Sequence, residues 1–215
     1  MVGPYVLAPG LARNLPRPAK DRWLGHFDLS LSSALRELLG VLDVIKHAAV
    51  PFELFAADNL GPLQNASPKA SHLLFAGHGN LGRGQQQLRL SNGRRCGAAD
   101  LAMFAPGATI VLNACWSGLV FDDIGSDPAD LALSLLAAGA HSVLGAIGLI
   151  SDRHAARFLS HCVLVLITGA PVARAVHHTI TELLSQDPLL PLNAWACYAT
   201  TGRAVDFAVV PDPPP

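Results

Sequence analysis

Residues 109–118, which read TIVLNACWSG, set both the fold and the chemistry of this chain. The stretch opens with a run of apolar and β-branched residues, which is the composition of a buried strand. The run stops at a turn of small residues that carries Cys115. Catalytic groups in α/β proteins collect at the carboxyl ends of strands. The stretch therefore predicts a strand that delivers a thiol to one edge of a sheet.

A second stretch of the same kind lies upstream, at residues 71–79, which read SHLLFAGHG. Its apolar run ends in His78, which stands between Gly77 and Gly79. A thiol at one strand end and an imidazole at another is an arrangement for nucleophilic catalysis. We interpret Cys115 as the nucleophile and His78 as the general acid and base.

The composition is that of one well-buried domain. The chain has 215 residues, of which 51% are hydrophobic and only 14% are charged, against about 25% charged in average domains. The net charge of −1 and the lack of a long basic run give direct nucleic-acid binding little electrostatic support. We expect a single domain over residues 1–210, followed by a Pro-rich tail at 211–215.

The cysteines and histidines indicate neither a metal nor a disulfide framework. Four cysteines stand apart, with no CxxC pair, so we expect a reducing, cytoplasmic setting. The nine histidines show no ligand-like spacing, which leaves a metal-binding module as a poor alternative, and we expect no cofactor.

We expect no membrane association from the sequence. The N-terminus lacks the features of a signal peptide. Residues 131–151 carry no charge and are long enough to span a membrane. Glycines at positions 139, 145 and 148 interrupt this segment, so we interpret it as a helix followed by a strand, with no membrane contact.

Elsewhere, strands alternate with helices. One helix is expected over residues 33–49, with apolar positions at helical spacing: Leu35, Leu38, Leu39, Leu42 and Ile45. Residues 11–30 and 80–86 are expected to be irregular loops. Further strands are expected near 2–9, 52–56, 142–147 and 194–200, and further helices over 98–104, 127–138, 151–167 and 171–185. The alternation predicts an α/β fold, with a mostly parallel sheet covered by helices on both faces.

Several blocks of the sequence resemble one family. Residues 75–79, FAGHG, and 112–118, LNACWSG, resemble the His-Gly and Ala-Cys-x-Ser/Thr-Gly blocks of the CHAT peptidases. These are caspase-like cysteine peptidases of clan CD, related to caspases, metacaspases and separase. Further blocks agree in the right order, at residues 88–93, 99–101, 135–143, 151–156 and 194–198. The resemblance covers residues 70–205 and implies the caspase-haemoglobinase fold, a three-layer α/β/α sandwich, with peptidase activity.

The same resemblance implies roles for further residues. The oxyanion hole would consist of the backbone N–H groups of Gly79 and Cys115. In metacaspases the residue two positions before the cysteine is often an Asp that binds a basic P1 side chain, but here it is Asn113. We therefore expect a neutral or mixed P1 pocket, which Asp122, Asp123 or Asp152 would make more acidic.

The resemblance also implies a biological setting. CHAT domains are often coupled to repeat or sensor modules, and several act in bacterial antiphage defence by cleaving a partner protein such as a gasdermin. Since this sequence shows no repeats, we expect a protein substrate and a separate sensor or regulatory protein. Two alternatives remain open: a catalytically silent CHAT-like scaffold, and a hydrolase of small acyl substrates that uses the same two residues.

Overall fold

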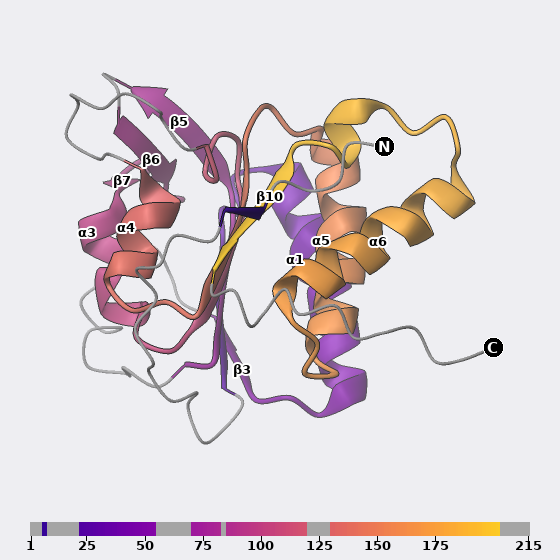
Figure 1. Cartoon of the computed structure of the whole chain (residues 1–215), viewed down its shortest axis with the longest axis horizontal. Coiled ribbons are helices and arrows are strands. Elements are labelled where there is room, and N and C mark those ends of the chain that lie inside the picture. Colours follow the sequence, from indigo (N-terminus) through magenta and orange to yellow (C-terminus); the bar gives the residue numbers. More distant parts are fainter. Residues whose placement is uncertain (1–5, 8–21, 55–69, 83–84, 120–129, 203–215) are drawn as a thin grey trace.

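A central sheet lies between two layers of helices (Figure 1). The computed structural model describes residues 6–7, 22–54, 70–82, 85–119 and 130–202. One face of the sheet is covered by three helices, α1 (Ser32–Ala48), α5 (Asp152–Leu166) and α6 (Val172–Gln186). The other face is covered by α3 (Ala98–Leu101), the 3-10 turn Ala102–Phe104 and α4 (Leu131–Ala137). The expected three-layer sandwich is confirmed.

The sheet is mostly parallel, as expected. Its strands in spatial order are β1 (Val6–Leu7), β10 (Tyr198–Gly202), β9 (Ser142–Ala146), β8 (Thr109–Asn113), β4 (His72–Ala76), β2 (Trp23–Phe27) and β3 (Phe52–Leu54). The β9–β10 pair is antiparallel, and the other pairs are parallel. The two stretches singled out in the sequence therefore form neighbouring central strands, β4 and β8.

Both faces of these central strands are buried in separate cores. On β4, Leu73 and Phe75 pack into the core beneath α4, whereas Leu74 and Ala76 pack into the core beneath α1, α5 and α6. Burial on both faces explains why the two strands are continuous apolar runs rather than alternating ones.

A second, smaller sheet flanks the central one and corrects an expectation. Residues 80–86 were expected to form a loop, but the chain instead forms an antiparallel sheet of β5 (His78–Gly82), β6 (Gln85–Arg89) and β7 (Arg95–Cys96). One side of this sheet faces solvent, so its strands are polar and lack an apolar run. The other side packs Leu88 and Cys96 into the core.

Two other expectations were wrong. The irregular stretch at 11–30 contains β2, whose five residues are all buried. Pro16, Pro18 and the scattered charges suggested a loop, whereas Gly25 of β2 is a packing residue, since a Cβ there would lie 2.5 Å from the Phe52 ring. The expected final strand at 194–200 begins later, at Tyr198, after the 3-10 turn Leu192–Ala194.

Helix α1 forms where it was expected, and its buried face is confirmed in part. Leu38 and Ile45 are buried as expected and Leu42 packs against the same core, but Leu35 and Leu39 are 47% and 59% exposed. The buried face also carries Ala34, Glu37 and Val41. It is therefore shifted toward these residues, and the shift buries a carboxyl group.

The uncharged segment 131–151 divides into α4 and β9, as expected. Among the described residues, no helix is long and apolar enough to cross a membrane. Several expectations fall wholly or partly outside the described residues: most of the strand at 2–9, the start of the helix at 127, Asp122 and Asp123, and the tail at 211–215.

The turn after β8 is fastened to β9 by a buried serine. Ser117 Oγ lies 2.7 Å and 2.9 Å from the carbonyl oxygens of Ala114 and Leu112, and it accepts the Ala146 N–H at 3.1 Å. One residue on, the Gly118 N–H donates to the Ala146 carbonyl at 2.8 Å. A Cβ on Gly145 would lie 2.6 Å from the Gly118 nitrogen, so the turn and β9 touch through their backbones.

We predict that Ser117→Ala destabilises the protein, because it leaves a buried N–H without its acceptor. The expected cost is about 1–3 kcal/mol, which corresponds to a fall of about 5 °C in the melting temperature of a chain this size. Ser185→Ala is the matched control, since Ser185 is exposed on α6. Equal melting temperatures for the two variants, measured by calorimetry, would contradict the role assigned to Ser117.

Candidate active site

The pairing of β4 with β8 brings His78 and Cys115 together. Ala76 and Asn113 end the two parallel strands and lie opposite each other. His78 and Cys115 each follow two residues later, and the Gly77 N–H donates to the Asn113 carbonyl at 3.3 Å. Both residues line one small pocket at this edge of the sheet. The two residues singled out in the sequence therefore share one site.

The Cys115 thiol is half-buried and faces a hydrogen-bond donor. The backbone N–H of Ile150 points to Cys115 Sγ at 3.5 Å. The sulfur is thus held at the turn by a backbone hydrogen bond from the segment that follows β9. The next residue, Trp116, has a φ of 63°, a conformation that costs a non-glycine residue free energy. Its N–H donates to the Gly148 carbonyl at 3.2 Å, which helps to hold the strained turn.

Gly79 lies directly against the backbone of Cys115. A Cβ on Gly79 would fall 1.7 Å from the Cys115 carbonyl oxygen and 3.0 Å from its nitrogen. Only glycine permits this approach. The two residues expected to supply the oxyanion hole are therefore neighbours in space.

Asn113 is buried beneath the thiol and is fully hydrogen-bonded. Its side-chain nitrogen donates to Glu37 Oε2 at 2.6 Å and to the Ala155 carbonyl at 3.3 Å. Its side-chain oxygen accepts from the Tyr198 hydroxyl at 2.6 Å. The Tyr198 ring in turn stacks on Phe158, with ring centroids 3.6 Å apart. The Asn113 amide is thus fixed in orientation by groups from α1, α5 and β10.

The pocket is acidic, although Asn113 is neutral. It is lined by Glu37 from α1 and by Asp152 from the first turn of α5. Burial raises the pKa of the Glu37 carboxyl to about 7; the Asn113 hydrogen bond opposes this shift and the nearby Asp152 adds to it. The sequence analysis missed Glu37. The signal was present, because Glu37 interrupts the apolar stripe formed by Ala34, Leu38 and Val41.

The other cysteines lie in different surroundings. Cys96 and Cys162 are buried, and burial raises the pKa of each thiol to about 12. Cys197 is half-buried, and burial together with the nearby Cys115 raises its pKa. Reactivity requires the thiolate, so these three thiols are poor nucleophiles near neutral pH. Among the described residues, no group of three or more His, Cys, Asp or Glu side chains is placed to hold a metal ion.

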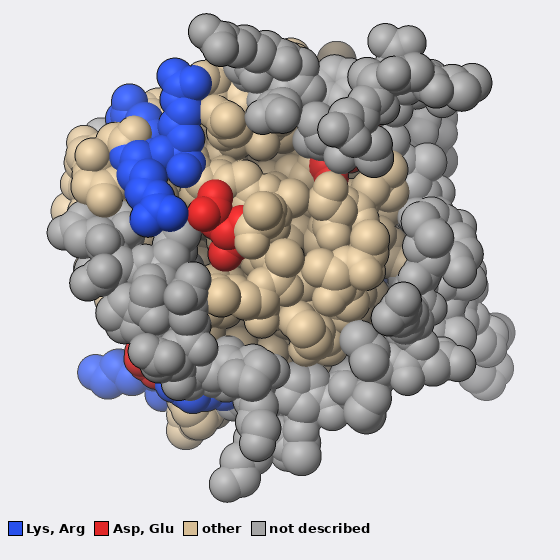
Figure 2. Space-filling model, turned by 90° about the vertical axis from the view of Figure 1, so that its left-hand side faces the viewer, with Lys and Arg blue, Asp and Glu red and all other residues tan. Residues whose placement is uncertain are grey.

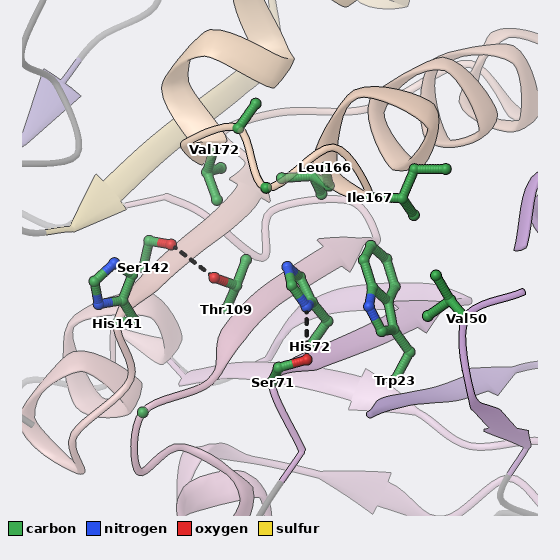
Figure 3. A pocket seen from close by; sticks show the side chains of 13 residues that line it. Trp23, Val50, Ser71, His72, Thr109, His141, Ser142, Leu166, Ile167 and Val172 are labelled. Carbon is green, nitrogen blue, oxygen red and sulfur yellow. Dashed lines mark hydrogen bonds between the residues drawn. The ribbon is translucent and has the colours of Figure 1, made fainter. Parts of the chain in front are cut away.

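A second pocket, of about 150 Å³, lies at the opposite ends of the central strands, where β2, β4, β8 and β9 begin (Figure 3). Its polar groups bond to one another: Ser71 Oγ to His72 Nδ1 at 2.9 Å, and Thr109 Oγ1 to Ser142 Oγ at 3.4 Å. Trp23 stacks on His72 with ring centroids 3.9 Å apart. Five-residue strands place this pocket about 15 Å from the thiol, so it takes no part in chemistry there.

The fold and the site define a class of protein, an α/β sandwich with a histidine and a cysteine at adjacent strand ends. A comparison with protein families matches the CHAT domain over residues 16–203. The chain belongs to the CHAT family. A comparison with curated proteins gives no match.

Solved structures of similar fold are cysteine proteases of clan CD. The Arg-specific cysteine proteinase gingipain R is 11% identical, with a TM-score of 0.60 over 87% of this chain and 49% of that one. The complex of Porphyromonas gingivalis RgpB pro- and mature domains gives the same TM-score at 9% identity, over 87% of this chain and 50% of that one. Separase, in the Saccharomyces cerevisiae separase–securin complex, is 14% identical, with a TM-score of 0.56 over 89% of this chain and 13% of that one. The chain thus spans about half of gingipain R and a small part of separase, and at these identities the likeness shows the fold alone.

We predict that Cys115 is alkylated first when the native protein is treated with iodoacetamide at pH 7. Cys96 and Cys162 should remain unmodified until the protein unfolds, because they are buried and their pKa values are high. Mass spectrometry of digests taken over time gives the order. Alkylation of Cys162 at the same rate as Cys115 would contradict the predicted order.

We predict that ionisation of the buried Glu37 carboxyl lowers the free energy of unfolding as the pH rises. The native carboxyl keeps its proton up to about pH 7, whereas the unfolded chain loses it near pH 4.5. The protonated carboxyl therefore makes its full contribution to the free energy of unfolding below pH 4.5. This contribution falls as the pH rises through 7, by about 3 kcal/mol at most. Glu37→Gln should remove this loss, so the variant should melt several degrees above the wild type at pH 8 and close to it at pH 4.5.

The matched control for this pH series is Glu182→Gln, a substitution at a partly exposed glutamate on α6 whose carboxylate accepts from Gln186. This variant should follow the wild type at every pH. A Glu37→Gln variant whose melting temperature tracks the wild type from pH 4.5 to 8 would show that the carboxyl is ionised in the native protein throughout.

Proposed function

We propose that this protein is a cysteine endopeptidase. The observation that carries the proposal is the pocket shared by Cys115 and His78, two residues beyond the paired ends of β8 and β4. The Ile150 N–H directed at the sulfur supports the same role. Membership of the CHAT family and the fold shared with gingipain R and separase agree with it.

The reaction would proceed through an acyl-enzyme. The Cys115 thiolate attacks the carbonyl carbon of the scissile peptide and forms a C–S bond. The backbone N–H groups of Gly79 and Cys115 stabilise the oxyanion. His78 donates a proton to the departing amine as the C–N bond breaks. It then takes a proton from water, which attacks the thioester and releases the acid product with the free thiol.

The P1 pocket would be mixed in character. Asn113 is neutral, but Glu37 lies at its base and Asp152 is an exposed carboxyl in its lining. Side chains that donate hydrogen bonds, basic ones included, would be favoured at P1, and acidic ones would be repelled. Gingipain R is described as Arg-specific; with Asn113 in place of a carboxylate, we expect a less strict preference here. Asp122 and Asp123 are proposed as further substrate contacts, on the sequence alone.

The setting is proposed from the family resemblance. We place the activity in the cytoplasm, directed at a protein partner such as a gasdermin in bacterial antiphage defence. The separase structure is a complex with securin, which supports a separate regulatory protein for this chain as well. Co-expression with proteins encoded beside its gene, followed by mass spectrometry of their fragments, tests the setting.

The primary test is digestion of a diverse peptide library, read by mass spectrometry. We expect cuts by the wild type, none by Cys115→Ala, and at least a 100-fold loss of rate in His78→Ala. Cys197→Ala is the matched control, because it removes a half-buried thiol near Cys115 and should leave the cuts in place. Cuts made equally by Cys115→Ala would overturn the proposal. An inert Cys115 thiol with no cuts would favour the scaffold.

A further inference from the structure

A groove on the small sheet includes His78 and extends across the strands to Arg95. It has a volume of about 350 Å³ and is lined by His78, Gly79 and Asn80 of β5, Gln87, Leu88 and Arg89 of β6, and Arg95 of β7. His78 also lines the pocket that contains Cys115, but Cys115 does not line this groove. The histidine therefore marks the boundary between two recognition surfaces.

The groove contains a straight row of one imidazole and two guanidinium groups. His78 lies directly opposite Arg89 in the β5–β6 pair, and Arg89 lies directly opposite Arg95 in the β6–β7 pair. Residues directly opposite each other in an antiparallel sheet project from the same face, and all three are exposed. Since neighbouring strands are about 4.8 Å apart, Arg95 is about 10 Å from His78.

The charges in this row are only partly compensated. Arg89 makes a long ion pair, at 3.8 Å, with the buried carboxylate of Asp28. Arg94, which does not line the groove, is paired with Asp100 at 3.3 Å. Arg95 donates to the neutral Gln87 at 3.4 Å, and within the described residues it pairs with no carboxylate. Lys and Arg side chains gather on this side of the molecule (Figure 2).

The chemistry at Cys115 fixes which part of a substrate reaches the groove. The acyl half of the substrate stays on Cys115, on the side of the acidic pocket. The amine half leaves past His78, which protonates it. The chain that follows the scissile bond therefore enters the groove, and three extended residues cover the 10 Å to Arg95.

We propose that this groove recognises acidic side chains in the three residues that follow the scissile bond, with Arg95 as a specificity-determining residue and Arg89 as its neighbour in the row. The proposal rests on the proposed endopeptidase function for its direction along the substrate. The active site would then be polarised, with the Asp152 carboxylate and the Glu37 carboxyl group on the acyl side and guanidinium groups on the amine side. Such complementarity selects partners by charge.

The first test measures binding and does not require cleavage. Fluorescent peptides shaped like the amine-side product, with a free N-terminus followed by Gly-Asp-Glu or by Gly-Asn-Gln, are titrated with the Cys115→Ala protein at low salt. We expect the acidic peptide to bind about fivefold or more tightly than its neutral counterpart. Arg95→Glu should abolish this difference, and raised salt should reduce it.

Arg94→Glu is the matched control, because it reverses a neighbouring charge that lies outside the groove and should keep the preference for the acidic peptide. Equal binding of the two peptides, or the same loss of preference in Arg94→Glu and Arg95→Glu, would overturn the proposal.

The second test asks whether the preference acts in cleavage. Two substrates share the residues before the scissile bond and differ only in acidic or amide residues after it. We expect the wild type to have a higher kcat/KM for the acidic substrate, and Arg95→Glu to reduce the ratio of the two values to one or below. Cleavage of both at equal rates by the wild type would refute the acidic preference while the peptidase function stood. If the preference for the acidic peptide depends on Arg95 but neither substrate is cleaved, the result would refute the peptidase function instead.

Discussion

The pairing of β4 with β8 is the constraint on which the site depends. Both strands are buried on both faces, so a slip of one residue would exchange the side chains between two differently shaped cores. Packing therefore fixes the register that sets Ala76 opposite Asn113. The positions of the imidazole and the thiol follow from this register, because each stands two residues beyond a paired strand end. The geometry of the candidate site is in this sense a product of core packing.

A buried polar network reinforces that geometry from below. Asn113 is held by Glu37 of α1, by the Ala155 carbonyl of α5 and by Tyr198 of β10, so three elements converge on the strand end that carries the thiol. A carboxyl group in this position costs free energy when ionised. Its retention beside a candidate catalytic pocket agrees with the tendency of perturbed groups to collect at functional sites.

The sequence predicts those features that depend on short-range pattern. The apolar runs of β4 and β8 and the turn residues around Cys115 identify the sheet, the layers and the two candidate catalytic groups. The parts that were missed depend on contacts distant in sequence. The prolines and charges of residues 11–30 hide the short strand β2, whose Gly25 allows the Phe52 ring to pack closely against it. Leu35 and Leu39 of α1 suggest a helix face shifted from the one that is buried. The role of Glu37 becomes visible only once Asn113, 76 residues away, lies beside it.

The small sheet joins the rest of the protein without sharing strand hydrogen bonds with the central sheet. It is fastened instead by side-chain packing, by the Arg89–Asp28 ion pair and by the backbone contact of Gly79 with Cys115. The arginines that line the proposed groove are exposed, whereas Leu88 and Cys96 of the same small sheet pack into the core. Solvent-facing residues of the hairpin can diverge under selection for new targets while the strands that form the core stay unchanged. This separation makes the hairpin a natural unit for grafting between related proteins.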